Sequence, residues 1–335
     1  MINGIKKLRQ WAYSLFRLNT MPVVKVYHGF GDDEALKVHG HVFSVSPFGR
    51  KSFKNKVLRN ALALIRLFMV KTKPRVEVTL HWMGQNYTTI TEDDGFFGFE
   101  WKAPQLLPTG WHDVAVSFVH RRWGEITGHG KIFIPGDSSI AFISDIDDTF
   151  LISHSSNLRK RLYVLLTSNA RTRKPFEGVV RHYQLLAQGG RPFFYVSSSE
   201  WNLYDYIRNF ADHNGIPDGV YLLNQIKHIS QFLKTGQNNH NGKYTRIVRL
   251  LKTYEDKQFV LLGDDSQQDP FIYQQLAKDF PGRILCIYLR HVREDRYEIV
   301  SKLQRTMQDE GGEICYFRHS EEAIAHSRKF GLIKD

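Results

Sequence analysis

Cysteine is scarce in this sequence, and long apolar runs are missing. Only two of the 335 residues are cysteines, Cys286 and Cys315, and their spacing is not that of metal ligands. Such sparse use predicts a reducing, cytoplasmic compartment, although the two thiols could also pair with each other. No stretch approaches the ~20 apolar residues of a transmembrane helix. The charges of Lys6, Lys7 and Arg9 interrupt the apolar core that a signal peptide would need. We therefore expect a soluble or peripheral protein.

Acidic residues are rare in the first 75 positions. This segment holds 15 Lys or Arg and only 3 Asp or Glu, so it carries the whole net charge of +12, while the other 260 residues hold 31 of each sign. A basic segment can serve an anionic membrane surface, nucleic acid or solubility. This one lacks the interleaved aromatic and basic residues of a groove for single-stranded nucleic acid, so that partner is not expected.

Two basic amphipathic helices are predicted in this part of the chain. Residues 1–22 form an N-terminal segment with Ile5 and Leu8 at helical spacing, and a second helix is predicted over about 52–70. Such helices can lie in a membrane interface or pack on their own domain. The first helix fits both alternatives, and packing against a sheet is favoured for the second. In the membrane alternative, residues 1–75 contact the inner face of a membrane peripherally.

A β-sandwich is predicted for residues 23–139. Apolar and polar residues alternate there in several short stretches, as they do in half-buried antiparallel strands. A hydrophobic content of 42%, with 13% aromatic residues, is enough for a sizeable core. The helix of about 52–70 would be inserted in this small domain. The alternating stretches are 24–27, 39–45, 76–82 and 113–119.

The middle of the chain carries the strongest chemical signal. The apolar run Ile140–Ile143 is followed, after one serine, by Asp145, Asp147 and Asp148 and then by Thr149. This pattern predicts a buried strand whose C-terminal end is crowded with carboxylates. Ligands of open α/β sheets bind beyond such strand ends. Closely packed acids repel one another unless a cation lies among them, and Mg²⁺ prefers oxygen ligands and works with phosphate groups.

The spacing of Asp145, Asp147 and Thr149 also suggests a mechanism. One carboxylate could attack phosphorus while the other handles the proton of the leaving group, which divides one difficult displacement into two easier steps. The string from Ile143 to Thr149 resembles motif I of the haloacid dehalogenase-like phosphohydrolases. Within them it is most similar to the actin-patch-associated phosphatidate phosphatase catalytic family. The resemblance covers about 140–331 well and 23–139 more loosely.

A second apolar strand also runs into acids. Residues 259–262 are followed by Asp264, Asp265 and Asp269. Two parallel strands with acidic ends can bring those acids together at one edge of a sheet. The resemblance identifies this stretch as motif IV, which completes the Mg²⁺ shell. The family usually has a small hydroxyl residue where Asp265 stands, so either Asp264 or Asp265 could contact the metal directly.

The resemblance also implies groups that bind phosphate. It makes Ser197, with Ser198 beside it, the anion-binding end of a strand over 192–196, and Lys243 the motif III lysine. The family commonly has proline where Glu200 stands. A basic stretch with Arg173 and Lys174 lies in a predicted lid over about 150–177; it could attract an anionic substrate or simply be a solvated loop.

These features together predict an α/β protein. Residues 140–335 would form a haloacid dehalogenase-like Rossmannoid domain with a central parallel sheet, preceded by the small β-sandwich. The predicted activity is Mg²⁺-dependent hydrolysis of a phosphomonoester through an aspartyl-phosphate, with phosphatidate as the implied substrate. The alternatives are a phosphatase of a soluble phosphorylated small molecule or phosphoprotein, and a non-catalytic lipid-binding scaffold. The proposed catalytic residues are Asp145, Asp147, Thr149, Ser197 and Lys243; substrate-binding residues are Ser198, Arg173 and Lys174; metal ligands are Asp145, Asp147 through its backbone carbonyl, Asp264, Asp265 and Asp269.

Overall fold

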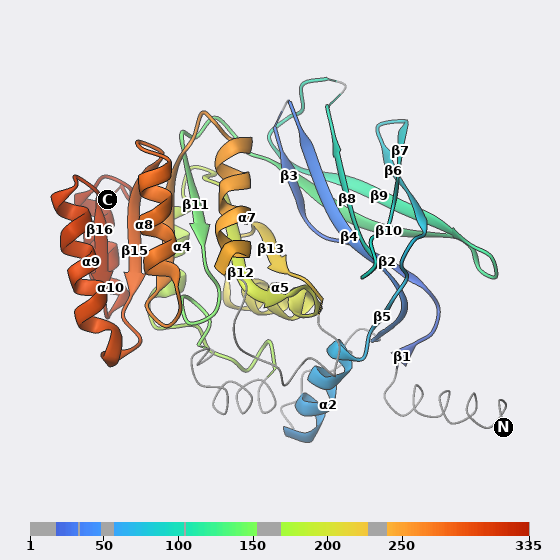
Figure 1. Ribbon diagram of the computed structural model, residues 1–335, viewed down its shortest axis with the longest axis horizontal. Coiled ribbons are helices and arrows are strands. Elements are labelled where there is room, and N and C mark those ends of the chain that lie inside the picture. Colours follow the sequence, from blue (N-terminus) through green and yellow to red (C-terminus); the bar gives the residue numbers. More distant parts are fainter. Residues whose placement is uncertain are drawn as a thin grey trace. The chain divides into compact units, whose positions relative to one another are not determined.

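The computed structural model describes most of the chain (Figure 1). The described ranges are 18–32, 34–47, 57–103, 105–152, 169–226 and 240–334, without the side chains of residues 57–59 and 240–241. The first predicted helix, over residues 2–18, lies outside these ranges except for Leu18, which is in a strand rather than a helix. Most of the predicted lid also lies outside the described ranges. The chain divides into two compact units: the first takes in Met1–Ile134 and Ile226–Thr235, and the second takes in Pro135–Gln225 and Gly236–Asp335.

The first unit consists mainly of antiparallel strands. The longest strand, β4, pairs with β1, β2, β3, β5 and β8, and a second group is formed by β6, β7, β9 and β10. The parallel pair β3–β10 joins the two groups into one ten-stranded sheet. The predicted division into two sheets of a sandwich therefore stays a prediction. The strands are β1 (Leu18–Asn19), β2 (Val23–Val26), β3 (Gly29–Gly31), β4 (Leu36–Pro47), β5 (Lys71–Thr72), β6 (Glu77–Trp82), β7 (Gln85–Ile90), β8 (Phe96–Trp101), β9 (Gly110–His120) and β10 (Gly124–Ile134).

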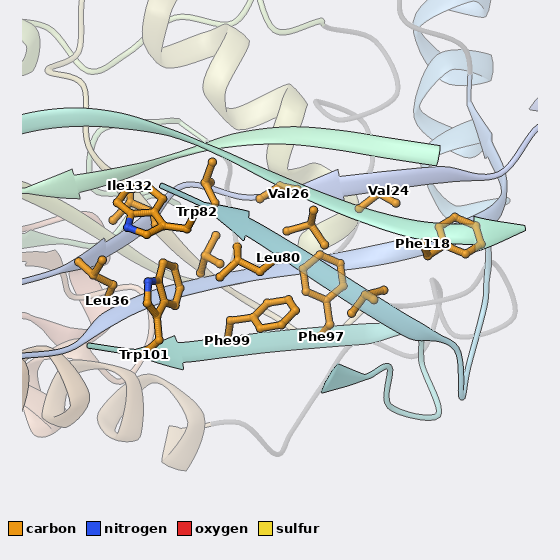
Figure 2. Close-up of a cluster of buried hydrophobic side chains, with 14 of the residues drawn as sticks. Val24, Val26, Leu36, Leu80, Trp82, Phe97, Phe99, Trp101, Phe118 and Ile132 are labelled. Carbon is orange, nitrogen blue, oxygen red and sulfur yellow. The ribbon is translucent and has the colours of Figure 1, made fainter. Parts of the chain in front are cut away.

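The core of this unit contains side chains from both strand groups. Figure 2 shows Val24, Leu36 and Phe97 of the β4 group together with Leu80 and Phe118 of the other group. Alternate residues of each strand point to this interior, which is why the two-residue period predicted strands here. The predicted strands over 24–27, 39–45, 76–82 and 113–119 are confirmed as β2, β4, β6 and β9.

The helix predicted over about 52–70 is present as α2 (Val57–Phe68). It contacts β4, and the side chains of Asn60, Leu64 and Phe68 are buried. These three residues recur every fourth position and so share one helix face. The favoured alternative, packing on its own unit, therefore holds for this face. The apolar residues Leu62 and Ile65 remain partly exposed.

The second unit is a mixed α/β structure with a six-stranded sheet in which every pair is parallel. The strand order is β13-β12-β11-β14-β15-β16. Its strands are nearly continuous apolar runs, as expected when helices cover both faces. The predicted parallel sheet is thus confirmed. The strands are β11 (Ile140–Ser144), β12 (Phe193–Glu200), β13 (Val220–Asn224), β14 (Gln258–Asp264), β15 (Ile284–Arg290) and β16 (Ile314–Phe317).

Helices cover both faces of this sheet (Figure 1). Helices α7, α8 and α9 pack side by side, and α4 contacts α10. The chain starts in the middle at β11, adds β12 and β13 on one side, and then crosses to add β14 to β16 on the other. A crevice that binds ligands is expected where the order reverses, beyond the ends of β11 and β14. The helices are α4 (Val179–Leu186), α5 (Tyr204–Asn214), α7 (His240–Thr253), α8 (Asp269–Asp279), α9 (Tyr297–Asp309) and α10 (Ser320–Lys329).

Within the described ranges, none of the helices combines the length and the apolar composition that crossing a lipid bilayer requires.

Candidate active site

The two acidic strand ends meet at the reversal point of the sheet. Strands β11 and β14 are neighbours, and the backbone N–H of Asp145 donates to the carbonyl of Leu262 at 2.8 Å. Asp145 and Asp264 follow at the same edge, and both side chains are buried. The parallel register explains this meeting, because equivalent positions of adjacent parallel strands end together. The sequence predicted this juxtaposition.

Three carboxylates form a buried cluster at this edge. Asp145, Asp264 and Asp269 each offer an oxygen, and these oxygens lie within 4.8 Å of one another. The Oδ2 atom of Asp269 is buried and has no hydrogen-bond partner in the part of the chain that the structure describes. Unpaired buried acceptors are costly and therefore rare. A hard divalent cation, which takes carboxylate oxygens, fits this cluster.

Gly263 leaves room for the third acid. A Cβ atom at this position would lie 2.7 Å from Oδ2 of Asp269 and 2.7 Å from the ring of Tyr273. Real Cβ atoms do not approach other heavy atoms so closely. The glycine therefore allows the carboxylate of Asp269, in the first turn of α8, to reach the end of β14.

Lys243 supplies a positive charge to this cluster. Its ammonium donates to Oδ1 of Asp145 at 2.7 Å and to Oδ1 of Asp269 at 2.5 Å. Burial opposes the charged form, but the two carboxylates outweigh burial and raise the pKa of Lys243 above its ordinary value. Lys243 is therefore a permanent cation at the site. The resemblance implied Lys243 as a site residue, and in the structure it contacts Asp145.

Without a further cation, ionisation of Asp145 and Asp264 is unfavourable. Burial raises the pKa of Asp145 to about 7; Lys243 opposes this rise, and Asp269 adds to it. Burial, followed by the charges of Asp269 and Asp145, raises the pKa of Asp264 well above its ordinary value. One lysine does not balance three buried carboxylates. The cluster therefore favours binding of a cation or of protons.

The turn after Asp145 places Thr149 against the acids. Its Oγ1 lies 2.9 Å from Oδ2 of Asp264 and 3.3 Å from Oδ2 of Asp145. Asp148 adopts a φ of +62°, in the left-handed region, and its N–H donates to the carbonyl of Leu151. A non-glycine residue held in this region is uncommon and is often found at functional sites.

Arg290 holds this turn from β15, which is separated from β11 by β14. Its Nε donates to the carbonyl of Thr149 at 3.1 Å, and its Nη2 donates to Oγ of Ser320 at 2.9 Å, in the first turn of α10. The guanidinium also lies 4.6 Å from the ring centroid of Phe176. Arg290 therefore braces the turn.

Asp147 is not part of the acidic cluster. Its Oδ2 accepts hydrogen bonds from Ser199 Oγ at 2.5 Å and from Ser197 Oγ at 3.3 Å. Ser197 and Ser199 of β12 thus both contact Asp147, whereas Ser198 has no hydrogen bond to Asp147 or to the acidic cluster in the described part of the chain. The predicted substrate-binding role of Ser198 thus receives no geometric support. Ser199 was overlooked, although the two-residue period of the strand could have identified it.

Asp265, the other proposed metal ligand, lies outside the cluster. Its Oδ1 accepts the backbone N–H groups of Val292 and Arg293, at 2.8 and 3.0 Å. Its Oδ2 is 2.7 Å from Nδ1 of His291 and accepts the hydroxyl of Tyr316 at 2.6 Å. Because both oxygens are already used, Asp264 rather than Asp265 faces Asp145. Of the two alternatives that the sequence left open, this geometry favours Asp264, and the metal contact itself stays a prediction.

The two basic residues proposed for substrate binding differ in position. Arg173 is buried, its Nη2 donates to the carbonyl of Ile152 at 2.7 Å, and its guanidinium lies 6.0 Å from the ring centroid of Tyr206. Lys174 is exposed. Neither has a hydrogen bond to the acidic cluster among the described residues. The rest of the predicted basic lid, residues 153–168, lies outside the described ranges.

Arg246 is a basic residue that the sequence analysis did not select. Its Nη2 donates to the backbone carbonyl of Ser197 at 3.1 Å, while its Nε is buried without a partner in the described chain. Burial, with a smaller contribution from Arg249, lowers the pKa of Arg246 to about 10. It lies three residues after Lys243 in α7, on the same helix face, and that spacing could have revealed it.

Comparison with known proteins agrees with this site. Residues 140–291 match the family model described as "Phosphatidate phosphatase APP1, catalytic domain". Phosphatidate phosphatase APP1 of Saccharomyces cerevisiae is 26% identical over 171 residues, which are 51% of this chain and 29% of the yeast protein. An uncharacterized protein of Schizosaccharomyces pombe, C29B5.04c, is 26% identical over 170 residues, 49% of this chain and 27% of that protein. The matches thus span less than a third of the length of these curated relatives.

Among solved structures, a phosphoserine phosphohydrolase-like protein from Francisella tularensis is 14% identical, with a TM-score of 0.32; the match covers 56% of this chain and 98% of that one. The segment that matches the family model, residues 140–291, includes β11, β12, β14 and β15 and every residue of the acidic cluster. The enzyme class predicted from the sequence, a phosphatase, is supported by the same match. Residues 140–291 are thus similar to the catalytic domain of the phosphatidate phosphatase APP1 family, the family that the acidic motifs resemble.

Proposed function

We propose that the second unit hydrolyses a phosphomonoester, with Asp145 as the nucleophile and phosphatidate as the substrate. The observation that carries this proposal is the arrangement around Asp145, a buried carboxylate held at 2.7 Å by the ammonium of Lys243 beside two further acids. Asp145 attacks phosphorus and forms an aspartyl-phosphate, and water then releases phosphate. The family of residues 140–291 supports phosphatidate, which would yield diacylglycerol and phosphate.

Asp147 is the general acid and base in this proposal. It lies two residues beyond the nucleophile, and the hydroxyls of Ser199 and Ser197 hold its Oδ2. A side chain held in this way can give a proton to the departing alkoxide and later accept one from water. Ser199 is a positioning residue here because it acts through Asp147. Because both hydroxyls bind Oδ2, the Oδ1 atom of Asp147 would take part in the reaction.

Phosphate binding is assigned to groups that face the nucleophile. Thr149 and Lys243 contact Asp145 directly, and Ser197 lies within the adjacent strand β12, where its hydroxyl contacts Asp147. Arg246, whose Nε has no partner in the described chain, would offer a further positive charge beside Ser197. Donors directed at the phosphoryl oxygens stabilise the charge of the transition state.

A divalent cation such as Mg²⁺, bound by Asp145, Asp264 and Asp269, would offset the charge of the incoming phosphate. Removal of one charge from this set should therefore weaken cation binding as well as turnover. The unpartnered Oδ2 of Asp269 is the oxygen that such a cation would satisfy.

We also propose a fold for each of the two larger parts of the chain. The position of the nucleophile at the end of a central strand, with strands added on one side and then on the other, supports a haloacid dehalogenase-like fold for residues 140–335. For residues 23–139, a single core lined by both strand groups supports a β-sandwich. Residues 1–22 and the lid over about 150–177 are proposed as separate segments.

The test is phosphate release by the full chain with Mg²⁺ or EDTA. Phosphatidate in detergent micelles would be compared with soluble phosphomonoesters, and Asp145→Asn with Asp309→Asn, which alters an exposed aspartate on α9. Asp145→Asn should abolish turnover and Asp309→Asn should retain it. Acid-quenched wild-type protein should carry labelled phosphate that base removes. Full activity in Asp145→Asn would exclude this nucleophile, and preference for a soluble ester would exclude phosphatidate as the substrate.

A further inference from the structure

The longest hairpin of the first unit ends in an unusual tip. Strands β9 and β10 pair without interruption from Gly110↔Ile134 to His120↔Gly124, and only three residues form the turn between them. The turn is closed by a hydrogen bond from the N–H of Trp123 to the carbonyl of His120 at 3.1 Å. Gly124 follows with a φ of +69°, which suits a three-residue hairpin turn. The tip is therefore a preformed element closed by this hydrogen bond. Figure 1 shows the β9–β10 hairpin that carries it.

Apolar side chains are exposed at this tip. Val119 is 79% exposed and Trp123 is 45% exposed, whereas the neighbouring Phe118 is 3% exposed and belongs to the core. The alternation of β9 thus continues to its last residues, so that Val119 points away from the core. A hairpin turn does not need a tryptophan, because glycine and polar residues form turns without exposing a large apolar side chain. The exposed pair is not required by the fold of the turn.

The same tip is strongly basic. Arg121 and Arg122 are exposed, and no ion pair of either arginine occurs in the described part of the chain. The guanidinium of Arg122 lies 4.9 Å from the ring centroid of Trp123, and the ammonium of Lys73 lies 5.6 Å from that of Phe118. The tip therefore carries both apolar side chains and several cations.

We propose that this tip, residues 119–124, docks on the surface of an anionic lipid bilayer. Trp123 and Val119 would enter the interface between headgroups and acyl chains, where tryptophan is favoured. Arg121 and Arg122 would bind lipid phosphates, for which the planar guanidinium is well suited. Each basic residue near such a surface contributes about 1 kcal/mol, or about a fivefold change in binding. Because the turn is preformed, little conformational entropy is lost on docking.

An acidic protein surface is the competing partner, and the apolar pair argues against it. Long-range attraction to an acidic protein would need only the arginines, which act by charge complementarity. A bilayer accounts for the charge and for the exposed Val119 and Trp123 together. This surface is separate from the proposed hydrolysis, since none of its residues lies in the catalytic unit.

The test is sedimentation of the full chain with vesicles of phosphatidylcholine alone or with phosphatidylserine, which leaves phosphatidate out. The variants are Val119→Ser with Trp123→Ser, and Arg121→Gln with Arg122→Gln. The matched control is Ile90→Ser, which removes another apolar side chain, 61% exposed, from β7 of the same unit. All of these side chains are exposed, so the variants should fold, and thermal unfolding would verify this.

Wild-type protein and the control should bind the anionic vesicles equally. The double arginine variant should bind about 25-fold more weakly, at about fivefold for each arginine. The variant at Val119 and Trp123 should also bind more weakly, and the shift of tryptophan emission on binding should disappear in Trp123→Phe. Hydrolysis of a soluble phosphomonoester should be unchanged in every variant.

Wild-type protein that does not bind these vesicles, or tip variants that bind like wild type, would overturn the docking surface. Binding of the arginines to an acidic protein without any vesicle binding would identify the competing partner instead. If wild-type protein bound the vesicles through the tip but showed no phosphatase activity, only the proposed hydrolysis would be contradicted. The two proposals therefore fail in distinguishable ways.

Discussion

Neutralising one buried acid of the candidate site should make the cation-free protein more stable. Asp264 lies with Asp145 and Asp269 in a cluster that contains a single lysine, and burial together with these acids raises its pKa. An acid whose pKa is raised in the folded state contributes its full stability below the pKa that it has in the unfolded state. This contribution is lost as the pH rises above the unfolded-state pKa and toward the folded-state pKa. Asp264→Asn should remove the penalty. It should also remove a ligand of the proposed cation.

The size of the gain follows from the pH. At pH 7 the buried group can avoid ionisation by keeping its proton, so the penalty cannot exceed the cost of protonating a carboxyl whose ordinary pKa is 3.8. That cost is about 1.4 kcal/mol per pH unit, or about 4 kcal/mol at pH 7 and under 2 kcal/mol at pH 5. The asparagine oxygen can still accept the N–H of Ser266, which now donates to Oδ1 of Asp264. We expect a gain of about 2 to 4 kcal/mol at pH 7.

Urea unfolding in EDTA and in excess Mg²⁺, at pH 5 and pH 7, measures both effects. The matched control is Asp265→Asn, which changes the neighbouring buried acid. Its carboxylate accepts hydrogen bonds on both oxygens, so this variant should be less stable by about 1 to 3 kcal/mol and should keep the stabilisation by Mg²⁺. Asp264→Asn should be more stable than wild type in EDTA and should not respond to Mg²⁺. A loss of stability in EDTA, or an undiminished response to Mg²⁺, would refute the reasoning.

Three further outcomes follow from the second unit. Arg246→Gln should lower kcat/KM for a phosphomonoester by about 10- to 100-fold in a phosphate-release assay, because it removes a charged donor, whereas Arg249→Gln, which changes an exposed residue of the same helix, should have little effect. Burial lowers the pKa of His182 to about 3, so the folded state does not take up the proton that the unfolded state binds below about pH 6.5. Unfolding free energy should therefore fall by up to about 1.4 kcal/mol per pH unit from pH 6.5 to pH 4, and this slope should be smaller in His182→Gln; an unchanged slope would contradict the assignment. Gly263→Ala should displace Asp269 and lower turnover by about 100-fold in the same assay, and wild-type activity there would mean that α8 can shift without cost.

The parts of the fold that the sequence predicted well are those with a strong period or a strong chemical boundary. Strands such as β11 and β14 are uninterrupted apolar runs that stop at carboxylates, and such runs have few other structural interpretations. Other elements carry weaker patterns. Strand β7, Gln85–Ile90, is mostly polar and exposed, and β16, Ile314–Phe317, has only four residues. Neither was predicted, because short or exposed strands bury too little apolar surface to leave a pattern.

The candidate site was predictable to the level of the motif, and less so to the level of the side chain. Asp145, Asp264 and Lys243 were predicted from strand ends and family motifs, and they meet in the structure. Asp265 was proposed beside Asp264 because the residues are adjacent, but neighbouring residues at a strand end point in different directions. Arg246 could be found only by extending the helix face of Lys243, and many arginines satisfy such a spacing. Side-chain direction, rather than residue type, separates these cases.

Arg290 links two segments that are far apart in the sequence. This one side chain joins the carbonyl of Thr149 to the hydroxyl of Ser320, so a segment made early and a segment made late share a single guanidinium. Ser320 also lies beyond residue 291, where the family match ends, so a fragment cut to the matched segment would contain every acid of the site but lack that anchor.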